Sequence, residues 1–432
     1  MKEEGAEEMN GAGPPRPRVA IVGAGPAGLM AAIAAAAGGA ETLVLERMER
    51  PGLKLLASGG GRCNLTNLAP PAEFMARFGR QGRFLQPALA ELDAAGLRQF
   101  FADRGVPTQA ADGFHVFPVA EDARAVLDAL LREAARQGVT LRTRCEVRSL
   151  EPRPGGGFRL RLAGGTAVAA TAVILAAGGC SYPGLGANGS GFELARGLGH
   201  TLVPPVPALV PLVTAEEWPR TLTGITFPDV ALRIALSRCR QMEWRGALLF
   251  THRGISGPAV LDASGEVAAL LAAGEATVPL HISFRPGRTP AAWREELARW
   301  RRGQGAKLLR TLLAGELPAA VAEVFAQMAG AAEERVARLT RDQEGRLAEA
   351  LAATPVTVTA TEGFARAMAT RGGASLKEVD PRTLESRRVP GLFLAGEVLD
   401  VDGPCGGYNL QWAFSSGQLA GRQAAQKKWC AH

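Results

Sequence analysis

The chain is poor in cysteine and lysine, and it has no long apolar run. Its six cysteines are scattered over 432 residues without a C-x-x-C pair, which argues against a zinc site and fits a reducing compartment. No stretch approaches the roughly 18 apolar residues of a membrane helix. The acidic start, M-K-E-E-G-A-E-E, lacks the cationic and apolar regions of a signal peptide. We therefore expect a cytoplasmic protein that neither enters a membrane nor binds a metal.

The basic charge balance has two explanations. Lysine and arginine number 49 against 42 acidic residues, which gives a net charge of +7, and because six of the 49 are lysines, 43 are arginines. A basic surface suits an anionic partner such as nucleic acid. Dispersed arginines in a chain rich in alanine and glycine also follow from the codon usage of a GC-rich genome. No dense basic block decides between the two explanations.

A strand, a glycine motif, a helix and a second strand follow one another near the N-terminus. Residues 18–22, R-V-A-I-V, predict a buried parallel strand, and G-A-G-P-A-G follows at 23–28. The alanine-rich segment after the motif predicts a helix, and a second strand at 42–45 ends in Glu46. Glu46 lies 23 residues after the first glycine of the motif, near the spacing of about 20 in dinucleotide-binding folds.

Each glycine of this motif has a physical use. Gly23 permits the tight turn, Gly25 lets a pyrophosphate approach the backbone, and Gly28 lets helix and strand pack closely. The helix N-terminus offers unpaired N–H groups to the phosphate, and Glu46 accepts hydrogen bonds from a ribose. A structural glycine turn is the alternative for the motif alone, but the ordered series predicts a dinucleotide site.

Glycine-rich segments recur along the chain. S-G-G-G at 58–61 and R-C-N-L-T-N at 62–67 predict a donor-rich loop that wraps the ribityl and pyrophosphate groups of a flavin, or else an ordinary surface loop. A strand at 172–175 runs into A-A-G-G, and a strand at 391–395 runs into G-E-V-L-D-V-D-G, where Glu397 is placed to hold a ribityl hydroxyl. A helix is expected to begin near Asn409 as its N-cap, with its positive end towards the flavin ring.

Four segments together resemble one flavoprotein family. They are V-G-A-G-P-A-G, S-G-G-G-R-C-N-L-T-N, F-T-H-R-G-I-S-G-P-A and G-E-V-L-D-V-D-G-P-C-G-G-Y-N-L-Q-W-A-F-S-S-G, and they extend from about residue 18 to residue 422. The chain resembles the HI0933-like (BaiN-like) family, within the flavoproteins that have two dinucleotide-binding domains. It departs from the family at Pro404-Cys405, because relatives more often carry a threonine before Gly-Gly-Tyr-Asn. This departure puts a catalytic use of that position in doubt.

The expected fold is α/β, a Rossmann-like FAD-binding domain with an inserted β-barrel-like domain and a helical subdomain. The proline-rich segment 201–213 is extended and marks a boundary. Short β patterns dominate 211–284, a helical period covers 289–352, and V-T-V-T-A after Pro355 returns to strand. The resembling family has the same three-part arrangement. We predict a disordered tail at 1–17, the FAD domain at 18–200 and 366–432, the β domain at 201–287 and 353–365, and the helical subdomain at 288–352.

The resemblance implies an FAD-dependent oxidoreductase with NAD(P)H as a transient electron donor. A second G-x-G-x-x-G, at 184–189, follows no strand directly, so we expect a loop there and no second nucleotide site. The activity expected from the family is reduction of an activated C=C bond, with a uridine of ribosomal RNA as the leading substrate. A small-molecule enone such as an unsaturated oxo-steroid is the alternative, and so is a non-catalytic flavin-binding redox sensor. The segment R-R-G-Q-G-A-K-L-L-R, 301–310, either touches RNA phosphates or forms a solvated helix face.

The residues expected at the cofactor and at the reaction follow from these motifs and from the resemblance. A proton donor is needed beside the flavin, and Cys63, Tyr408 and His252 are candidates. Packing with a hydrogen bond is the commoner explanation for Cys63 and Tyr408, and orientation of a turn at the domain interface is the alternative for His252. The expected FAD-binding residues are Gly23, Gly25, Pro26, Ala27, Gly28, Glu46, Arg47, Lys54, Ser58, Gly60, Gly61, Arg62, Cys63, Asn64, Val147, Ala177, Gly178, Gly179, Gly396, Glu397, Asp400, Gly407, Asn409, Leu410 and Gln411.

Overall fold

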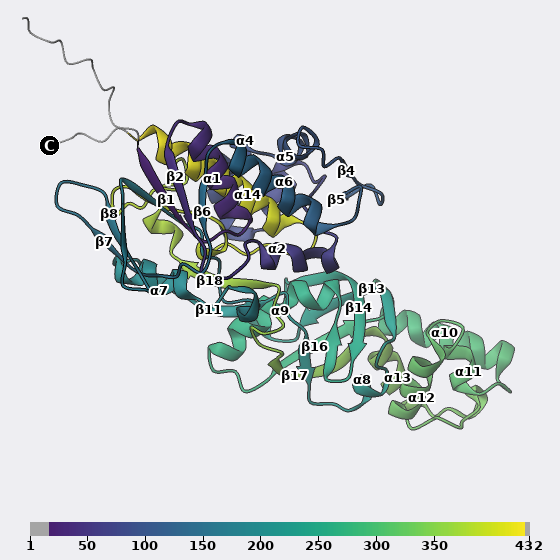
Figure 1. Cartoon of the computed structure of the whole chain (residues 1–432). Coiled ribbons are helices and arrows are strands. Elements are labelled where there is room, and N and C mark those ends of the chain that lie inside the picture. Colours follow the sequence, from purple (N-terminus) through teal and green to yellow (C-terminus); the bar gives the residue numbers. More distant parts are fainter. Residues whose placement is uncertain (1–16, 428–432) are drawn as a thin grey trace, which may run out of the picture.

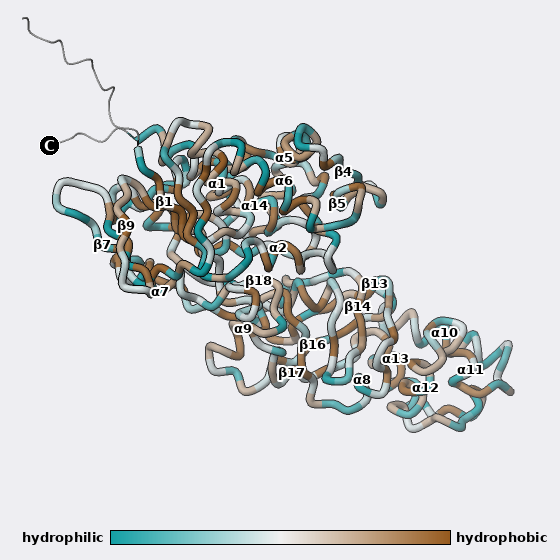
Figure 2. Tube along the Cα trace, in the orientation of Figure 1, coloured by the Kyte–Doolittle hydropathy of each residue, from teal (hydrophilic) through white to brown (hydrophobic). Residues whose placement is uncertain are grey.

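A parallel sheet forms the centre of the cofactor-binding part. The computed structural model describes residues 17–427, so the predicted tail lies outside the described residues except for Pro17. The sheet has the order β19-β10-β1-β2-β6, and its strands β1, β2 and β6 are labelled in Figure 1. Its strands are β1 (Arg18–Val22), β2 (Glu41–Leu45), β6 (Thr140–Arg142), β10 (Ala172–Leu175) and β19 (Leu392–Leu394). The central strands are largely apolar because both of their faces are covered, which Figure 2 shows as a brown centre.

Two helices pack tightly against each other beside this sheet. They are α1 (Pro26–Ala37) and α14 (Tyr408–Gln426), from opposite ends of the chain (Figure 1). The contact depends on a missing side chain in α14, because a Cβ at Gly417 would lie 2.3 Å from the Ala27 carbonyl oxygen. Helix α14 is thereby fixed against α1, the helix that follows the first glycine motif. The N-terminus of α14 lies in the same part of the fold as α1.

Smaller elements surround the sheet. Two three-stranded antiparallel sheets have the orders β7-β8-β9 and β3-β5-β4. Their strands are β3 (Thr66–Asn67), β4 (Thr108–Gln109), β5 (His115–Pro118), β7 (Val147–Pro152), β8 (Phe158–Leu162) and β9 (Ala167–Ala170). The helices here are α2 (Leu53–Ala57), α3 (Pro71–Ala76), α4 (Gly82–Glu91), α5 (Ala94–Ala102), α6 (Ala123–Arg136) and α7 (Ser190–Gly197).

A closed antiparallel barrel lies below this part, with the order β12-β15-β14-β13-β16-β17 (Figure 1). Its strands are β12 (Leu212–Thr214), β13 (Thr226–Ile234), β14 (Glu243–Thr251), β15 (Gly254–Ser256), β16 (Val278–Ser283) and β17 (Thr354–Thr361). Helices α8 (Trp218–Thr221) and α9 (Pro258–Ala272) pack against it. The predicted barrel-like insertion is confirmed.

Four helices form the far end of the molecule. They are α10 (Pro290–Gln304), α11 (Leu309–Leu313), α12 (Ala319–Met328) and α13 (Arg341–Ala352). Their buried side chains, including Trp293 and Phe325, join the same apolar core as the barrel strands. The helical region therefore extends the barrel and has no separate core of its own.

The proline-rich segment is extended, as predicted, but its first part does not enter the barrel. Strand β11 (Leu202–Ala208) pairs with β18 (Ala369–Ala374), which follows the insertion in the sequence. This two-stranded ribbon joins the parallel-sheet part to the barrel part. The residue limits that we predicted for the domains remain a prediction. None of the helices between residues 17 and 427 is both long and apolar enough to cross a membrane.

Candidate functional site

The first glycine motif forms an open cradle at the start of α1. Gly23 has a left-handed backbone (φ +102°), and a Cβ there would lie 2.6 Å from the Ala176 carbonyl oxygen. A Cβ at Gly28 would lie 1.9 Å from the Gly23 carbonyl oxygen, so these two glycines are required by the chain itself. Gly25 differs, because it is the N-cap of α1 and no atom lies within 4 Å of the position that a Cβ would take. The free space therefore lies at the positive end of the helix, where a phosphate is stabilised.

Glu46 is fixed at the end of β2 by backbone donors. Its Oε2 accepts a hydrogen bond of 2.7 Å from the N–H of Ala24, and its Oε1 accepts one of 2.8 Å from the N–H of Met48. The side chain is held beside the glycine motif, and each oxygen keeps a lone pair for a further donor. The ribose contact of Glu46 remains a prediction.

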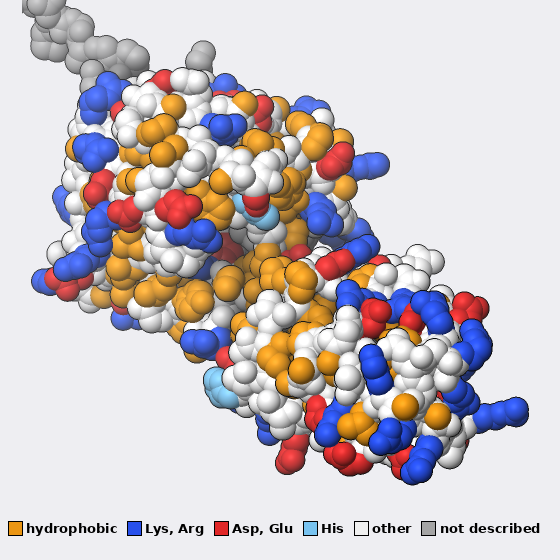
Figure 3. All heavy atoms as spheres, turned by 90° about the vertical axis from the view of Figure 1, so that its right-hand side faces the viewer, with side chains coloured by type: hydrophobic (Ala, Val, Ile, Leu, Met, Phe, Trp, Pro, Cys, Tyr) orange, Lys and Arg blue, Asp and Glu red, His pale blue; other side chains and the backbone are white. Residues whose placement is uncertain are grey.

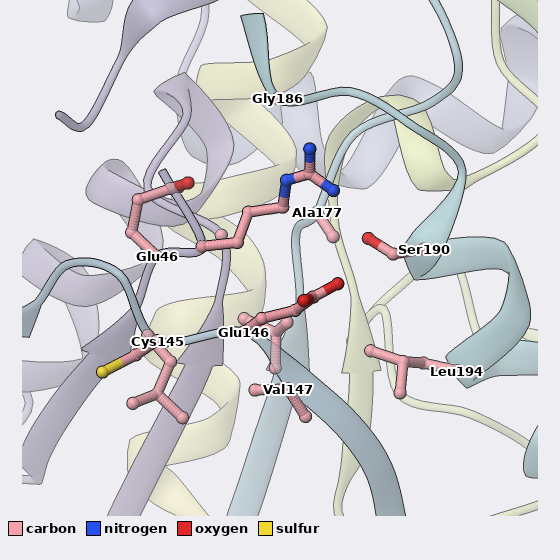
Figure 4. Close-up of a pocket in the computed structure, with 12 residues that line it drawn as sticks. Glu46, Cys145, Glu146, Val147, Ala177, Gly186, Ser190 and Leu194 are labelled. Carbon is pink, nitrogen blue, oxygen red and sulfur yellow. The ribbon is translucent and has the colours of Figure 1, made fainter. Parts of the chain in front are cut away.

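A pocket at Glu46 brings together segments that are distant in the sequence (Figure 4). Arg47, Val147 and Ala177, all predicted to bind the cofactor, line it. Ser190 and Leu194 of α7 also line it, and no sequence motif singles them out. The second glycine motif forms the turn before α7, and its Gly186 lines this same pocket. The expected loop therefore lies beside the first motif, and its contact with a cofactor remains a prediction.

An ion pair lies where α2 meets the ends of β10 and β19. Lys54 Nζ is 2.5 Å from Oε2 of Glu397 and also contacts the Ser181 hydroxyl. Oε1 of Glu397 accepts hydrogen bonds from Ser181 Oγ (2.8 Å) and from the N–H of Thr370 (2.7 Å). The structure therefore joins the predicted residues Lys54 and Glu397, whereas the ribityl contact of Glu397 remains a prediction. Ser181 and Thr370 were not predicted.

The S-G-G-G segment is a tight turn with left-handed backbone at Gly59, Gly60 and Gly61. Space is open around Gly60 and Gly61, because no atom lies within 4 Å of the position that a Cβ would take at either residue. Cys63, also left-handed (φ +62°), is fully buried, and burial raises the pKa of its thiol to about 12. The turn therefore leaves open space beside its backbone while its cysteine stays protonated inside.

Helix α14 begins within one residue of the predicted start, but its N-cap differs from the prediction. The helix begins at Tyr408, and Gly407, with φ +86°, is its N-cap. A Cβ at Gly407 would lie 2.5 Å from the Thr66 carbonyl oxygen, so only glycine fits this position. The predicted N-cap, Asn409, is wrong because its side chain instead bonds the backbone N–H (2.9 Å) and carbonyl (2.8 Å) of Gly403. It thereby closes the loop before the helix.

The three candidate proton donors lie in different surroundings. Cys63 is buried, and Tyr408 is buried with its ring 4.7 Å from that of Phe74 and 6.0 Å from that of Phe78. His252 is exposed in the turn between β14 and β15 of the barrel. Their catalytic roles remain predictions.

Further predicted cofactor residues surround the same region. Gln411 is buried in α14, where its Nε2 donates to the Leu92 carbonyl at 2.9 Å. The Arg62 guanidinium lies 4.8 Å from the centre of the Phe117 ring. A Cβ at Gly179 would lie 2.4 Å from Thr370 Oγ1, so the backbone approaches the Lys54–Glu397 ion pair closely. The cofactor contacts of these residues remain predictions.

A histidine that no sequence motif marked lies against the G-G-Y-N segment. His115 Nδ1 is 2.6 Å from Oδ2 of Asp112, and Oδ1 of Asp112 accepts from the N–H groups of Phe114 (2.9 Å) and His115 (2.8 Å). The imidazole beside it holds the pKa of Asp112 well below its usual range. A Cβ at Gly406 would lie 3.1 Å from Nε2 of His115. The only signal in the sequence was D-G-F-H, an acid three residues before a histidine.

Charged residues join the loop before α14 to the barrel helix α9. Arg371 of β18 lies 3.1 Å from Asp402 and 3.0 Å from Glu266 of α9. The N–H of Cys405 donates to Oδ1 of Asp262, also on α9, at 2.7 Å. Burial raises the pKa of Asp262 and of Asp402. This network spans the boundary at which Figure 3 shows hydrophobic side chains gathered around a hollow.

Within the described part of the chain, no three His, Cys, Asp or Glu side chains are grouped to hold a metal.

A Rossmann-type sheet with an open glycine cradle and an acid after the second strand defines the class of dinucleotide-binding proteins, which take NAD or FAD. The family of the HI0933-like protein Rossmann domain matches residues 17–423. The chain belongs to this HI0933-like family of FAD-dependent oxidoreductases.

Known proteins of similar sequence cover nearly the whole chain. The 3-dehydro-bile acid delta(4,6)-reductase of Clostridium scindens is 36% identical over 413 residues, which is 95% of this chain and 99% of that protein. The ribosomal RNA dihydrouridine synthases of Escherichia coli and Haemophilus influenzae are 33% and 32% identical, each over 92% of this chain and 95% of their own length. A solved flavocytochrome c3 fumarate reductase shares the fold, with a TM-score of 0.50 and 18% identity over 96% of this chain and 79% of that chain.

Proposed function

We propose that this protein uses NAD(P)H to reduce bound FAD and that the flavin then reduces an activated C=C bond. One observation carries the proposal: similar proteins with two different names, a delta(4,6)-reductase and dihydrouridine synthases, share one chemical change, addition of two hydrogens across a C=C bond. Flavin supplies the hydride in such reactions. The leading substrate is a uridine of ribosomal RNA.

The residues fit FAD in several places. The space at Gly25 suits the pyrophosphate, and Glu46 suits a ribose. The turn at Gly60 and Gly61 leaves open space in which a cofactor can approach the backbone. The start of α14 supplies a positive helix end for the reduced ring. This support comes from the fit of the groups, and the individual contacts are part of the proposal.

NAD(P)H is proposed to bind only transiently. Residues 17–427 contain one parallel-sheet cradle of the dinucleotide type, and the second glycine motif is a turn beside it. A nucleotide that delivers a hydride and leaves needs no second full Rossmann unit. The measurement is stopped-flow bleaching of the flavin by NADH and by NADPH. If neither nucleotide bleaches the flavin, the reductase proposal is wrong and a non-catalytic redox sensor takes its place.

Different observations support the two candidate substrates. The basic charge balance favours RNA. A small enone such as an unsaturated oxo-steroid is favoured by the relative with 36% identity and by the hydrophobic side chains around the hollow in Figure 3. Dihydrouridine is therefore to be measured in ribosomal RNA from a strain without the gene, with and without the gene restored. Unchanged dihydrouridine would remove the RNA substrate and leave the enone.

A further inference from the structure

His115 is held in one orientation by a carboxylate that is itself fixed. Asp112 receives two backbone N–H donors through Oδ1 and bonds the imidazole Nδ1 through Oδ2. A carboxylate that accepts from Nδ1 fixes a proton on Nδ1 and holds the ring in one orientation, with Nε2 on the opposite side. The pair has the geometry of an oriented acid–base group.

The second nitrogen of this ring lies beside the start of α14. In the β3–β5 pairing, His115 is opposite Asn67, and Asn67 Nδ2 donates to the Gly406 carbonyl at 2.8 Å. His115 Nε2 has no hydrogen-bond partner among the described residues, and it lies at the edge of Gly406. The side chain is 38% exposed, so a bound molecule can reach it. Asp112 is the only charged group that pairs with the ring in the described structure.

We propose that His115 is the general acid of the C=C reduction, which rests on the proposed function above. One alkene carbon gains a hydride from the reduced flavin. At the other carbon a new C–H bond forms as the Nε2–H bond of the His115 imidazolium breaks, and its electron pair stays on Nε2. Solvent then returns a proton to Nε2. The sum is NAD(P)H plus a proton plus C=C, giving NAD(P)⁺ and CH–CH.

The other candidate donors are less suited than His115. Cys63 is buried and carries a thiol that is a weaker acid than usual, because burial raises its pKa to about 12. Tyr408 is buried against two phenylalanine rings. His252 is exposed but belongs to a barrel turn, with no carboxylate bonded to its ring in the described chain. Among these candidates, His115 alone combines exposure, a fixed orientation and a position at G-G-Y-N.

The kinetic test compares His115→Gln with wild type in two half-reactions of the holoenzyme. NAD(P)H bleaching of the flavin and its reoxidation by O₂ should stay within about threefold of wild type, because neither needs a directed acid. Reoxidation of the reduced enzyme by a 4,6-dien-3-one steroid, and by ribosomal RNA from the deletion strain, should slow at least about 100-fold for whichever of the two the wild type accepts. His281→Gln, on an exposed position of β16, is the matched control.

The outcomes separate this inference from the proposed function. If wild type reduces neither acceptor, the proposed function is wrong and the assignment of His115 is overturned with it. If wild type reduces one acceptor and His115→Gln does so at an equal rate, only His115 is wrong. A variant that slows both half-reactions alike has lost structure or flavin placement, and that result also overturns the acid role.

A second readout does not depend on turnover. The chain has five histidines, so their imidazole signals in a ¹⁵N-labelled holoenzyme are few enough to assign. The signal that disappears in His115→Gln is the signal of His115. Asp112→Asn should shift this signal and no other. It should also slow reduction of the accepted substrate, by a smaller factor than His115→Gln does. An unmoved His115 signal would show that the Asp112–His115 contact is absent in solution and would overturn the proposal.

Discussion

At the scale of single residues, Gly25 and Gly28 respond differently to the same substitution. A side chain at Gly28 meets the Gly23 carbonyl oxygen at 1.9 Å, whereas a side chain at Gly25 enters open space. We expect Gly28→Leu to lower the free energy of unfolding of the apoprotein by about 1–3 kcal/mol or more through overpacking. Gly25→Leu should leave the apoprotein stable but occupy the phosphate cradle, so the purified protein loses its yellow FAD.

Urea unfolding of the apoprotein and the ratio of flavin to protein absorbance measure the two effects. Glu46→Ala supplies an independent comparison, since it should weaken FAD retention from the ribose side of the same site. A Gly25→Leu protein that remains fully yellow would contradict the pyrophosphate assignment.

The buried thiol of Cys63 predicts a loss of stability at alkaline pH. Its pKa rises from 9.0 to about 12 on folding. Between these values the folded state therefore holds a proton that the unfolded state has lost, so the free energy of unfolding falls as pH rises from about 9 to 12. The slope is about 1.4 kcal/mol per pH unit for one such group. Cys63→Ala should flatten this slope in urea unfolding at pH values from about 8 to 11, and an equal slope in both proteins would refute it.

Residues that meet at the candidate site were predictable from sequence only where a motif carries them, and their roles remain predictions. Lys54 and Glu397 were identified by the motifs around them, and the structure brings them to 2.5 Å. Ser181 and Thr370 complete the same cluster, but they come from segments that meet only when β18 and the end of β10 fold together. Spacing along the chain does not encode such contacts. His115 was missed for the same reason, since its significance depends on Gly406, which lies far away in the sequence.

At the scale of elements, Arg371 is the link between β18, the loop before α14 and the barrel helix α9. Arg371→Gln leaves the mostly buried Asp402 and the partly buried Glu266 without their cation. We expect the free energy of unfolding to fall by about 1–3 kcal/mol, because a buried charged group that loses its hydrogen-bonded partner is left desolvated without compensation. Arg196→Gln removes an exposed ion pair with Glu193 and should cost less than about 0.5 kcal/mol. Urea unfolding at neutral pH compares the two, and equal costs would contradict this role.

Element types were predictable because hydrophobic periodicity is local. The strand at 172–175, for example, matches β10. Element ends were less predictable. Helix α14 starts at Tyr408 because the Thr66 carbonyl leaves room only for glycine at position 407, a constraint imposed by a distant strand. Strand β11 was expected with the barrel, but its partner β18 lies on the other side of the insertion, and a proline-rich sequence does not reveal its partner.

At the scale of the whole molecule, some arginines are exposed and unpaired among the described residues and can contact an anionic partner, whereas others already form ion pairs with acidic residues. In the helical region many arginines form ion pairs with neighbouring acids: Arg288, Arg294, Arg299, Arg301, Arg310 and Arg346. These charges are largely neutralised locally, which weakens the expectation that 301–310 contacts RNA. Arg77, Arg80 and Arg83, at and between α3 and α4, are exposed and form no ion pair with any described residue.

The stretch of chain that carries these three arginines packs against the G-G-Y-N segment through other residues. Phe74 and Phe78, on the same stretch of chain, pack against Tyr408, and Gln81 donates to the Asp400 carbonyl at 2.6 Å. If the substrate is RNA whose target base lies beside His115, we expect its neighbouring phosphates to contact these exposed arginines. A small steroid would have no need of them.

The triple variant Arg77→Gln, Arg80→Gln, Arg83→Gln consequently distinguishes the two substrates. If RNA is the substrate, its binding should weaken, and the slope of log affinity against log salt should decrease by about 0.7–0.9 for each phosphate that the variant no longer binds. Reduction of a steroid enone by the same variant should be unchanged. The matched control replaces the ion-paired Arg294, Arg299 and Arg346 by glutamine and should leave the salt slope unaltered. If both triple variants lose RNA binding equally, the total charge of the protein determines binding and the position of the arginines does not. The proposed path of the RNA over α3 and α4 would then be wrong.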